Sequence, residues 1–498
     1  MSSPYATLAT VTDHGRSSDT PALTAADLLA ATGGALLRHS DRPIRGGAVD
    51  SRLVEPGTLF VALAGERTDG HRYLADAAAA GAAAFIVGRS PDASAGETAI
   101  EALGDVSVVL VEDPLRALQA VAAVWRRRFD PLVVGITGSI AKTSTKEAVA
   151  GVLERRFETL RTEGNQNNEV GLPLTVLRLG PEHGAAVLEM GMYVGGEIRD
   201  LAAIGRPSIG IVTAVGPVHL SRIGSLEAIE AAKAELIEAL PAAGDGGVAI
   251  LNADDHRVRR MASRTAARTT TYGFAPDADV RAESVESRGL DGMRFVLLTP
   301  AGQRTVEIAA LGRLAVHNAL AATAAGLAAG MTLDEIVPGL AAPSRAPHRS
   351  VVIRAGGVVI VDDSYNASPG SMVAALELLT GLPARRRIAV LGEMRELGDA
   401  HDEGHLQVGE AAGRALDTLV VVDGGPGGRA AGIVEGALAA GLPAGHLIAV
   451  DDAAAAVDAV LAVVGDGDAV LVKASRGIEL ERVVDRLVAR LGGPEPAR

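Results

Sequence analysis

An apolar run that leads into a glycine and then a lysine is the feature that most constrains the fold. Residues 132–137 are apolar apart from Gly135 and Thr137, a pattern typical of a strand buried on both faces of a parallel sheet. A loop at 138–144 follows, and a helical pattern begins at its end. Strand patterns alternate with helical patterns farther along the chain. This alternation predicts parallel pairing through right-handed crossovers, and therefore an α/β fold.

The loop after this strand has the composition of a phosphate-binding loop. Its residues are Gly138, Ser139, Ile140, Ala141, Lys142, Thr143 and Ser144. In such loops backbone N–H groups cradle phosphate oxygens, the lysine reaches the β- and γ-phosphates, and the hydroxyl after it binds Mg²⁺. We therefore expect ATP and Mg²⁺ as cofactors, bound by these seven residues, with Lys142 catalytic. The alternative is an ordinary strand-to-helix turn with a capping serine or threonine.

Ala141 departs from the usual pattern, which has glycine before the lysine. A methyl group at this position would crowd a phosphate, or strain a backbone that needs a positive φ. Because Lys142 and Thr143 are both present, we still expect ATP to bind, and we expect Ala141 to affect its affinity.

Polar residues follow the other predicted strands, at the edge where ligands gather in parallel sheets. Glu189 lies at the end of a strand predicted at 185–190, and His219 follows a strand predicted at 209–213. Together with Thr143 they could bind magnesium, which prefers oxygen ligands and tolerates an occasional imidazole. Taken alone, Glu189 could equally be a capping carboxylate and His219 a hydrogen-bonded structural histidine. Lys233 lies among small apolar residues of a helical stretch and by itself reads as a surface lysine.

Length and composition limit the classes of protein that remain. The chain has 498 residues, of which 48% are apolar and 2% aromatic, so two to four domains are expected. A net charge of −14 argues against a nucleic-acid partner, and the absence of cysteine excludes disulfides and thiolate chemistry. No leader and no apolar run of transmembrane length is evident, so we expect a cytoplasmic protein without membrane insertion.

The chain divides into three segments behind a short tail. The tail is predicted at 1–19, and the segments at 20–128, 129–345 and 346–498. In the second segment, β-rich runs between 269 and 308 predict a small antiparallel addition. A proline-containing stretch at 342–347 predicts a linker, and a further series of strands and helices begins at 358.

Several short motifs along the chain together resemble the Mur ligase family. They are the loop at 138–144, Asp50-Ser51-Arg52 with the run 56–63, Asp69-Gly70-His71, Asn165-Gln166-Asn167-Asn168, His317-Asn318-Ala319-Leu320, 362–367 and 391–398. Their order and spacing are specific, and the likeness covers nearly the whole chain after the tail. Besides Ala141, this sequence departs from the family pattern at 218–222 and at Lys473-Ala474, where Lys-Gly is usual.

The resemblance implies a three-domain α/β enzyme. A small N-terminal α/β domain would bind UDP, a central P-loop ATPase-like parallel sheet would bind ATP, and a C-terminal Rossmann-like domain would bring in a dipeptide. For the substrates, the resemblance implies that Ser51 and Arg52 bind UDP, that Asn167 and Asn168 lie along the nucleotide-sugar peptide, and that Lys473, Ser475 and Arg476 bind substrate near the closing interface.

For the nucleotide and the metal, the resemblance implies that Asn318 contacts adenine and that Arg349 and Asp363 meet phosphate and ribose. It also implies that Lys233 is carbamylated and binds Mg²⁺ together with Thr143, Glu189 and His219. The residues implied to be catalytic are Lys142, His219 and Lys233.

The activity implied by the resemblance is ATP-dependent amide ligation. D-alanyl-D-alanine would be added to UDP-N-acetylmuramoyl-tripeptide through an acyl phosphate, as a step of peptidoglycan precursor synthesis. We expect the protein to be a monomer. One alternative is a Mur-like ligase acting on another acid and amine, such as a folate, a polyglutamate or a modified cofactor. Another is a non-catalytic nucleotide-binding homologue, suggested by Ala141. A GTPase is disfavoured because no Asn-Lys-x-Asp segment is evident.

Overall fold

The computed structural model describes residues 21–65, 68–89, 99–218, 220–342 and 346–494. The predicted tail at 1–19 and the predicted site residue His219 therefore lie outside the described residues. The chain forms two compact units, one of residues 1–130 with 176–183, the other of residues 131–175 with 184–498.

The first unit is built on a five-stranded sheet. Its elements are α1 (Ala25–Thr32), β1 (Ala35–Arg38), β2 (Gly47–Ala48), β3 (Leu59–Val61), α2 (Leu74–Ala79), β4 (Ala84–Val87), β5 (Ser107–Leu110) and α3 (Pro114–Arg126). The strand order is β1-β5-β4-β3-β2, and β1 alone among these strands runs antiparallel to its neighbour. Phe60 and Phe85 from adjacent strands pack edge to face in the core, with ring centroids 6.0 Å apart.

The second unit begins with a nine-stranded sheet. Its strands are β6 (Leu132–Thr137), β7 (Thr159–Arg161), β8 (Ala185–Glu189), β9 (Ile209–Val212), β10 (Val248–Asn252), β11 (Arg268–Gly273), β12 (Val280–Ser287), β13 (Met293–Thr299) and β14 (Gly302–Ile308). The order is β14-β13-β12-β11-β10-β9-β6-β8-β7, so chain progression reverses at β6. That reversal is the point where open α/β sheets bind ligands, because the loops on either side diverge there. The loop at 138–144 leaves the sheet at this point.

The predicted antiparallel addition is a continuation of this sheet. β12 pairs parallel with β11 through only two residue pairs, Tyr272 with Val280 and Gly273 with Arg281. β13 and β14 then extend the sheet in antiparallel pairing. One sheet therefore carries both the strand ends predicted to form the site and the antiparallel extension β12–β14.

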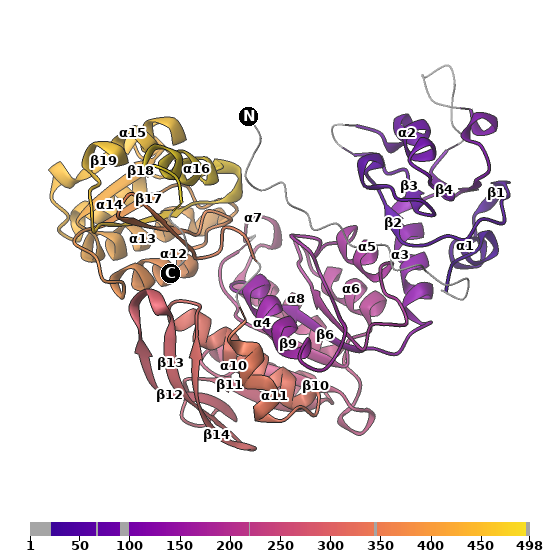
Figure 1. Ribbon diagram of the computed structural model, residues 1–498, viewed down its shortest axis with the longest axis horizontal. Coiled ribbons are helices and arrows are strands. Elements are labelled where there is room, and N and C mark those ends of the chain that lie inside the picture. The colour runs from indigo at the N-terminus through magenta and orange to yellow at the C-terminus, as the bar shows by residue number, and fades with distance from the viewer. Residues whose placement is uncertain (1–20, 66–67, 90–98, 219, 343–345, 495–498) are drawn as a thin grey trace. The chain divides into compact units, whose positions relative to one another are not determined.

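Helices cover both faces of the nine-stranded sheet (Figure 1). On one face lie α4 (Lys142–Leu153), α10 (Arg313–Ala328) and α11 (Leu333–Leu340), and on the other α6 (Glu197–Gly205) and α8 (Leu226–Glu238). Val134 and Ile136 pack into the core beneath α4 and α10. Gly135 faces the opposite side, where a methyl group on it would lie 2.8 Å from Leu236 Cδ1 of α8. The face of β6 toward α8 therefore leaves little room for a side chain at position 135. Three short helices, α5 (Gly171–Val176), α7 (Leu220–Ile223) and α9 (His256–Arg259), lie in the connections.

The remainder of the second unit is a doubly wound sheet. Its elements are β15 (Val351–Ala355), β16 (Val358–Asp362), α12 (Pro369–Thr380), β17 (Arg387–Leu391), α13 (His401–Ala415), β18 (Thr418–Val422), α14 (Ala431–Ala439), β19 (Leu447–Val450), α15 (Ala453–Val463), β20 (Ala469–Lys473) and α16 (Glu481–Arg490). The order is β15-β16-β20-β17-β18-β19, with β15 antiparallel to β16. One apolar core lies beneath α12–α14 and another beneath α15 and α16. β15 was not among the strands predicted from the sequence.

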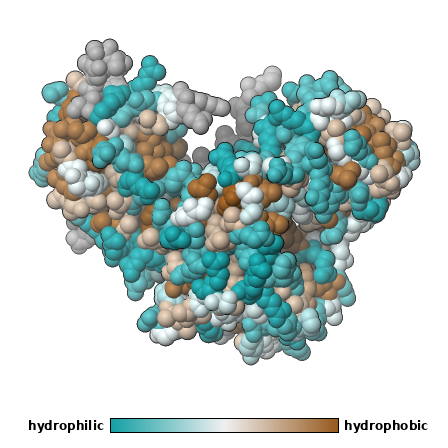
Figure 2. Space-filling model, turned by 180° about the vertical axis from the view of Figure 1, so that it is seen from behind, coloured by the Kyte–Doolittle hydropathy of each residue, from teal (hydrophilic) through white to brown (hydrophobic). Residues whose placement is uncertain are grey.

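Three sheets, one within each predicted segment, confirm the predicted three-domain α/β class. The segment boundaries themselves stay predictions. Within the part of the chain that the structure describes, no helix is long and apolar enough to cross a membrane. On the face seen in Figure 2, hydrophilic residues are widespread and hydrophobic ones gather in separate patches.

Candidate active site

The loop at 138–144 is fixed to the end of the neighbouring strand β9. The Ser139 hydroxyl donates to the Gly216 carbonyl at 3.0 Å, and the Gly216 N–H donates back to Ser139 Oγ at 2.8 Å. The Thr213 hydroxyl donates to the Ile140 carbonyl at 2.6 Å. Gly138 is required here, because a methyl group on it would lie 1.9 Å from Thr213 Oγ1. The loop is therefore held in shape by the protein itself.

Lys142 is the first residue of α4 and is half-buried. Its ammonium donates to the Gly138 carbonyl at 2.7 Å, folding back over the loop. Burial lowers its pKa, Glu189 acts to raise it, and Arg349 adds to the lowering. Burial removes water that would otherwise stabilise the ammonium. The negative oxygens of a bound phosphate would replace that water and stabilise the charge.

Ala141 has a left-handed backbone, which was one of the two consequences of an alanine here that the sequence suggested. Its φ is 65° and its ψ is 6°, in the left-handed region, immediately before α4. An L-residue with a Cβ atom is disfavoured there, whereas glycine is not.

We expect Ala141→Gly to raise the free energy of unfolding by about 0.5–1 kcal/mol. Glycine relieves the backbone strain of the folded state, and this gain exceeds the loss that comes from the greater entropy of the unfolded chain. Gly330 provides the matched control, since its φ is 74° and a methyl group there would contact nothing within 4 Å. Gly330→Ala should lower stability by a similar amount. Urea unfolding of both variants measures this, and a loss of stability in Ala141→Gly would contradict the expectation.

Three of the four predicted magnesium ligands are buried around one cavity of about 430 Å³. Thr143 is 7% exposed, Glu189 2% and Lys233 2%, and all three line this cavity together with Lys142. Asn167 donates its amide N–H to Glu189 Oε1 at 2.7 Å. Among the described residues, Glu189 Oε2 has no hydrogen-bond partner. A buried carboxylate oxygen without a partner fits a cation, because leaving it unpaired is costly.

A magnesium ion in the smaller cavity would need ligands other than carboxylates and imidazoles. Across the residues described, no group of three or more His, Asp or Glu side chains could hold a metal. Thr143 and Glu189 therefore fit magnesium as part of a set completed by other oxygen donors, consistent with its preference for oxygen ligands and retained water. His219 lies outside the described residues.

Lys233 is buried within α8, so the interpretation of it as a surface lysine is wrong. Its pKa is well below the ordinary value, because burial and then the charge of Lys142 disfavour the ammonium. The sequence has four lysines. Two form ion pairs, Lys146 with Glu147 at 2.9 Å and Lys473 with Asp363 at 2.6 Å. Among the described residues, Lys233 has no such anion beside it.

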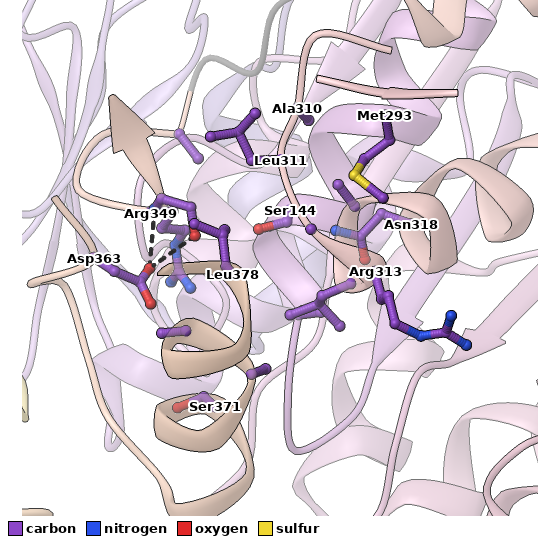
Figure 3. A pocket seen from close by; sticks show the side chains of 18 of the residues that line it. Ser144, Met293, Ala310, Leu311, Arg313, Asn318, Arg349, Asp363, Ser371 and Leu378 are labelled. Atoms are coloured by element: carbon purple, nitrogen blue, oxygen red, sulfur yellow. Dashed lines mark hydrogen bonds between the residues drawn. The ribbon is translucent and has the colours of Figure 1, made fainter. Parts of the chain in front are cut away.

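A second, larger cavity of about 640 Å³ contains the residues predicted to bind adenosine (Figure 3). Arg349 and Asp363 lie on one side of it, and Asn318, from α10, lies on the other. Asn318 Oδ1 accepts a hydrogen bond from the Thr145 hydroxyl at 3.0 Å, which orients its amide. Asp363 Oδ1 accepts from the Ser350 N–H at 3.0 Å.

The two cavities share part of their walls. The shared residues come from the 138–144 loop, from the segment at 218 and from the start of the C-terminal sheet: Ser139, Ala141, Val218, Arg349, Tyr365, Asn366, Ala367 and Ser368. A nucleotide whose base lies in the larger cavity can therefore extend its phosphates along the loop toward Lys142.

The residues predicted to bind substrate in the second unit are divided between the cavities. Asn167, Asn168, Ser475 and Arg476 line the smaller one, and Lys473 lines the larger. Asn168 Oδ1 accepts from the Gly171 N–H at 2.9 Å, and Ser475 Oγ accepts from the Arg395 N–H at 2.9 Å. Lys473, 3% exposed, also donates to the Asn366 carbonyl at 2.8 Å. Its ammonium is thus engaged within the protein, and its contact with substrate stays a prediction.

Ser51 and Arg52 belong to the first unit. They begin a short 3₁₀ turn, residues 51–53, that is capped by the Asp50 side chain. The exposed Arg52 pairs with Asp50 at 2.6 Å, and its hydrogen bonds lower the pKa of that carboxyl. The turn therefore exposes Arg52 in a position fixed by Asp50. The role of Ser51 and Arg52 in UDP binding stays a prediction.

Tyr365 and Arg395 are among the residues lining the smaller cavity that the sequence did not predict as site residues. Tyr365 lies within the motif at 362–367, and Arg395 lies within the motif at 391–398. Arg395 donates from Nε to Glu393 Oε2 at 2.9 Å. Their position in those motifs was the signal available, but nothing in the spacing distinguished them from their neighbours.

Comparison with known proteins gives matches along almost the whole chain. Residues 43–156 match the Mur ligase family catalytic domain, 136–326 the Mur ligase middle domain, and 348–476 the Mur ligase glutamate ligase domain. The UDP-N-acetylmuramoyl-tripeptide–D-alanyl-D-alanine ligase of Escherichia coli (strain K12) is 38% identical over 391 residues, covering 78% of this chain and 83% of that protein.

Solved structures agree with this match. MurF from Acinetobacter baumannii superposes with a TM-score of 0.82 at 31% identity, covering 94% of this chain and 99% of the other. MurF ligase from Thermotoga maritima, solved in complex with ADP, gives 0.77 at 29% identity, with coverage of 90% and 98%. The chain therefore belongs to the Mur ligase family.

Proposed function

We propose that this protein is an ATP-dependent ligase that joins D-alanyl-D-alanine to UDP-N-acetylmuramoyl-tripeptide in peptidoglycan precursor synthesis. Relatives named for this activity align with most of the chain. The observation that carries the proposal is the pair of cavities with a common wall, one containing Asn318 and Asp363, the other Lys142 and Glu189. That arrangement suits a nucleotide whose terminal phosphate meets a second substrate.

The chemistry must activate the acid, since an amine does not displace oxide from a carboxylate at neutral pH. The carboxylate oxygen of the tripeptide attacks the γ-phosphorus of ATP, giving an acyl phosphate and ADP. The dipeptide amine then attacks the carbonyl carbon, and phosphate leaves with the activating oxygen. Lys142 offsets the charge on the transferring group, and a closed site excludes the water that would hydrolyse the acyl phosphate.

Magnesium, when bound, neutralises charge on the phosphates. We propose Thr143, Glu189, His219 and a carbamylated Lys233 as the residues that hold it. Asn318 would contact adenine, Asp363 the ribose and Arg349 a phosphate. Ser51, Arg52, Asn167, Asn168, Lys473, Ser475 and Arg476 are proposed for the other substrates. The cytoplasmic location, the monomeric state and the lack of a nucleic-acid partner remain predictions of the sequence.

Carbamylation should occur at Lys233 and at no other lysine. A neutral amine reacts with CO₂, and the pKa of Lys233, well below its ordinary value, favours that form. Lys146 and Lys473 are paired with carboxylates. The pKa of Lys142 is also lowered, but its ammonium donates to the Gly138 carbonyl and Glu189 acts to raise that pKa. We expect ¹³C-bicarbonate to give a carbamate signal in the NMR spectrum of the wild type. The signal should be lost in Lys233→Arg and kept in Lys142→Ala. A signal that persists in Lys233→Arg would refute the assignment.

The substrate pair is tested by ADP release across a panel of UDP-muramyl peptides, each with and without D-alanyl-D-alanine. The proposal predicts release that requires the UDP-tripeptide and is completed by the dipeptide. Release with a folate or polyglutamate acid in place of the muramyl peptide would favour the alternative ligase. No release with any acid would favour the non-catalytic homologue.

A further inference from the structure

We propose that Tyr365 is a positioning residue that supports Arg349 and Arg476 on one aromatic ring and so orders the anion-binding side of both cavities. The guanidinium carbon of Arg349 lies 4.2 Å from the ring centroid, and that of Arg476 lies 5.0 Å from it. Both are within the range of a cation–π interaction. The inference rests on the proposed function, because that function supplies the anions.

The topology brings these three residues together. Arg349 precedes β15, Tyr365 follows β16 and Arg476 follows β20, and these strands are consecutive in the order β15-β16-β20. β16 and β20 are parallel and β15 is antiparallel to β16. The start of β15 and the ends of the other two strands therefore lie at one edge of the sheet. That edge is also where Lys473 pairs with Asp363.

The ring supports two arginines for which the described residues provide no carboxylate partner. Among the residues described, neither Arg349 nor Arg476 forms an ion pair, and each contacts Tyr365. Arg349 lines both cavities, and Arg476 lines the smaller one. Their charges are thus available to ligand anions. A long side chain loses rotamer freedom when it binds an anion, and prior contact with a ring reduces that loss.

The backbone around Arg349 is arranged to direct it. His348 and Ser350, on either side, have φ values of 56° and 53°. Two non-glycine residues in the left-handed region persist only where surrounding contacts determine the conformation. Those contacts come from the Tyr365 segment: the Tyr365 N–H donates to the His348 carbonyl at 3.2 Å, and Asp363 accepts from Ser350. The ring and the arginine that it supports are therefore fixed to each other.

The two arginines serve different ligands in this scheme. Arg349 lines both cavities together with Ser139 and Ala141 of the 138–144 loop, so it would face the nucleotide phosphates. Arg476 belongs to the C-terminal domain, which is proposed to bring in the dipeptide, and it would face that ligand's free carboxylate. Removing the ring should therefore weaken nucleotide and dipeptide binding together and leave the muramyl tripeptide unaffected.

The test compares Tyr365→Leu with Tyr365→Phe, which keeps the ring. Calorimetry with Mg²⁺ and a non-hydrolysable β,γ-methylene ATP analogue should give a Kd about five- to tenfold higher for the leucine variant. Its KM for D-alanyl-D-alanine should rise about as much, and its KM for the UDP-tripeptide should stay within about twofold. Tyr365→Phe should match the wild type. In an Arg349→Met background, Tyr365→Leu should leave the nucleotide Kd unchanged, because the two residues act as one unit.

Phe157→Leu is the matched control, since the guanidinium carbon of Arg156 lies 5.6 Å from the centroid of that ring and neither residue lines either of the two cavities described above. It should leave all three constants unchanged. If Tyr365→Leu does not fold, Tyr365→Met replaces it. Wild-type constants in the leucine variant, equal losses for all three ligands, or a phenylalanine variant as weak as leucine would each overturn the inference. Nucleotide binding is measured without turnover, so failure of the proposed ligase activity would be seen separately in the wild type.

Discussion

Lys142→Ala is expected to lower kcat for phosphate release by about a thousandfold or more, the effect typical of removing a charge aimed at a transferring phosphoryl group. Lys142 begins α4 and lies over the loop with its ammonium 2.7 Å from the Gly138 carbonyl. Steady-state phosphate release with all three substrates saturating measures the change. Wild-type turnover in this variant would remove Lys142 from the chemistry.

The same variant should not be less stable than the wild type. The folded-state pKa of Lys142 is lowered, mainly by burial, so its ammonium opposes folding at every pH below the ordinary lysine pKa. Removing it therefore leaves the unfolding midpoint unchanged or raises it near neutral pH. Arg155→Ala, which removes an exposed cation just after α4, should change neither rate nor stability. A large fall in the midpoint for Lys142→Ala would mean that lost activity reports unfolding.

Glu189→Gln is expected to lower kcat by about a hundredfold or more and to raise the magnesium concentration needed for half-maximal rate. The glutamine carbonyl can still accept from Asn167, so the packing around Oε1 is kept. What is lost is the negative charge on a carboxylate whose Oε2 has no partner among the described residues. The pKa of Lys142 should also fall further, because Glu189 acts to raise it.

A magnesium titration at saturating ATP separates this effect from general damage. Glu286→Gln is the matched control, because Glu286 is an exposed carboxylate on β12 of the same sheet. Its titration curve should overlie that of the wild type. An unchanged magnesium dependence in Glu189→Gln would contradict the assignment of Glu189 as a ligand.

Local features were predictable from the sequence. β6 is apolar because both of its faces are covered by helices. The motif of the next loop is made of consecutive residues, so β6, the loop at 138–144 and the start of α4 could all be located from the sequence. The positive φ of Ala141 was predictable for the same reason, since the loop dictates its own backbone. Glu189 was predictable as a residue at a strand end, because parallel strands end at one edge.

Features that depend on tertiary packing were not predictable. Lys233 lies among alanines, a pattern that suits an exposed or a buried helix face equally, and only the packing of α8 decides between them. Lys473 pairs with Asp363, which is more than a hundred residues away, and no spacing rule links the two. β15 is short and partly exposed, so its sequence carries little of the apolar signal of a central strand. Tyr365 and its two arginines meet only because three strands are adjacent.

The central claim is that an oxygen of the acid passes to phosphate through an acyl phosphate, and ¹⁸O in the tripeptide carboxylate tests it most directly. UDP-muramyl tripeptide labelled at that carboxylate is incubated with ATP, Mg²⁺ and D-alanyl-D-alanine, and the released phosphate is analysed by mass spectrometry. The account predicts one ¹⁸O atom in each phosphate released. Phosphate that carries no label, in a reaction that still forms the amide, would contradict it.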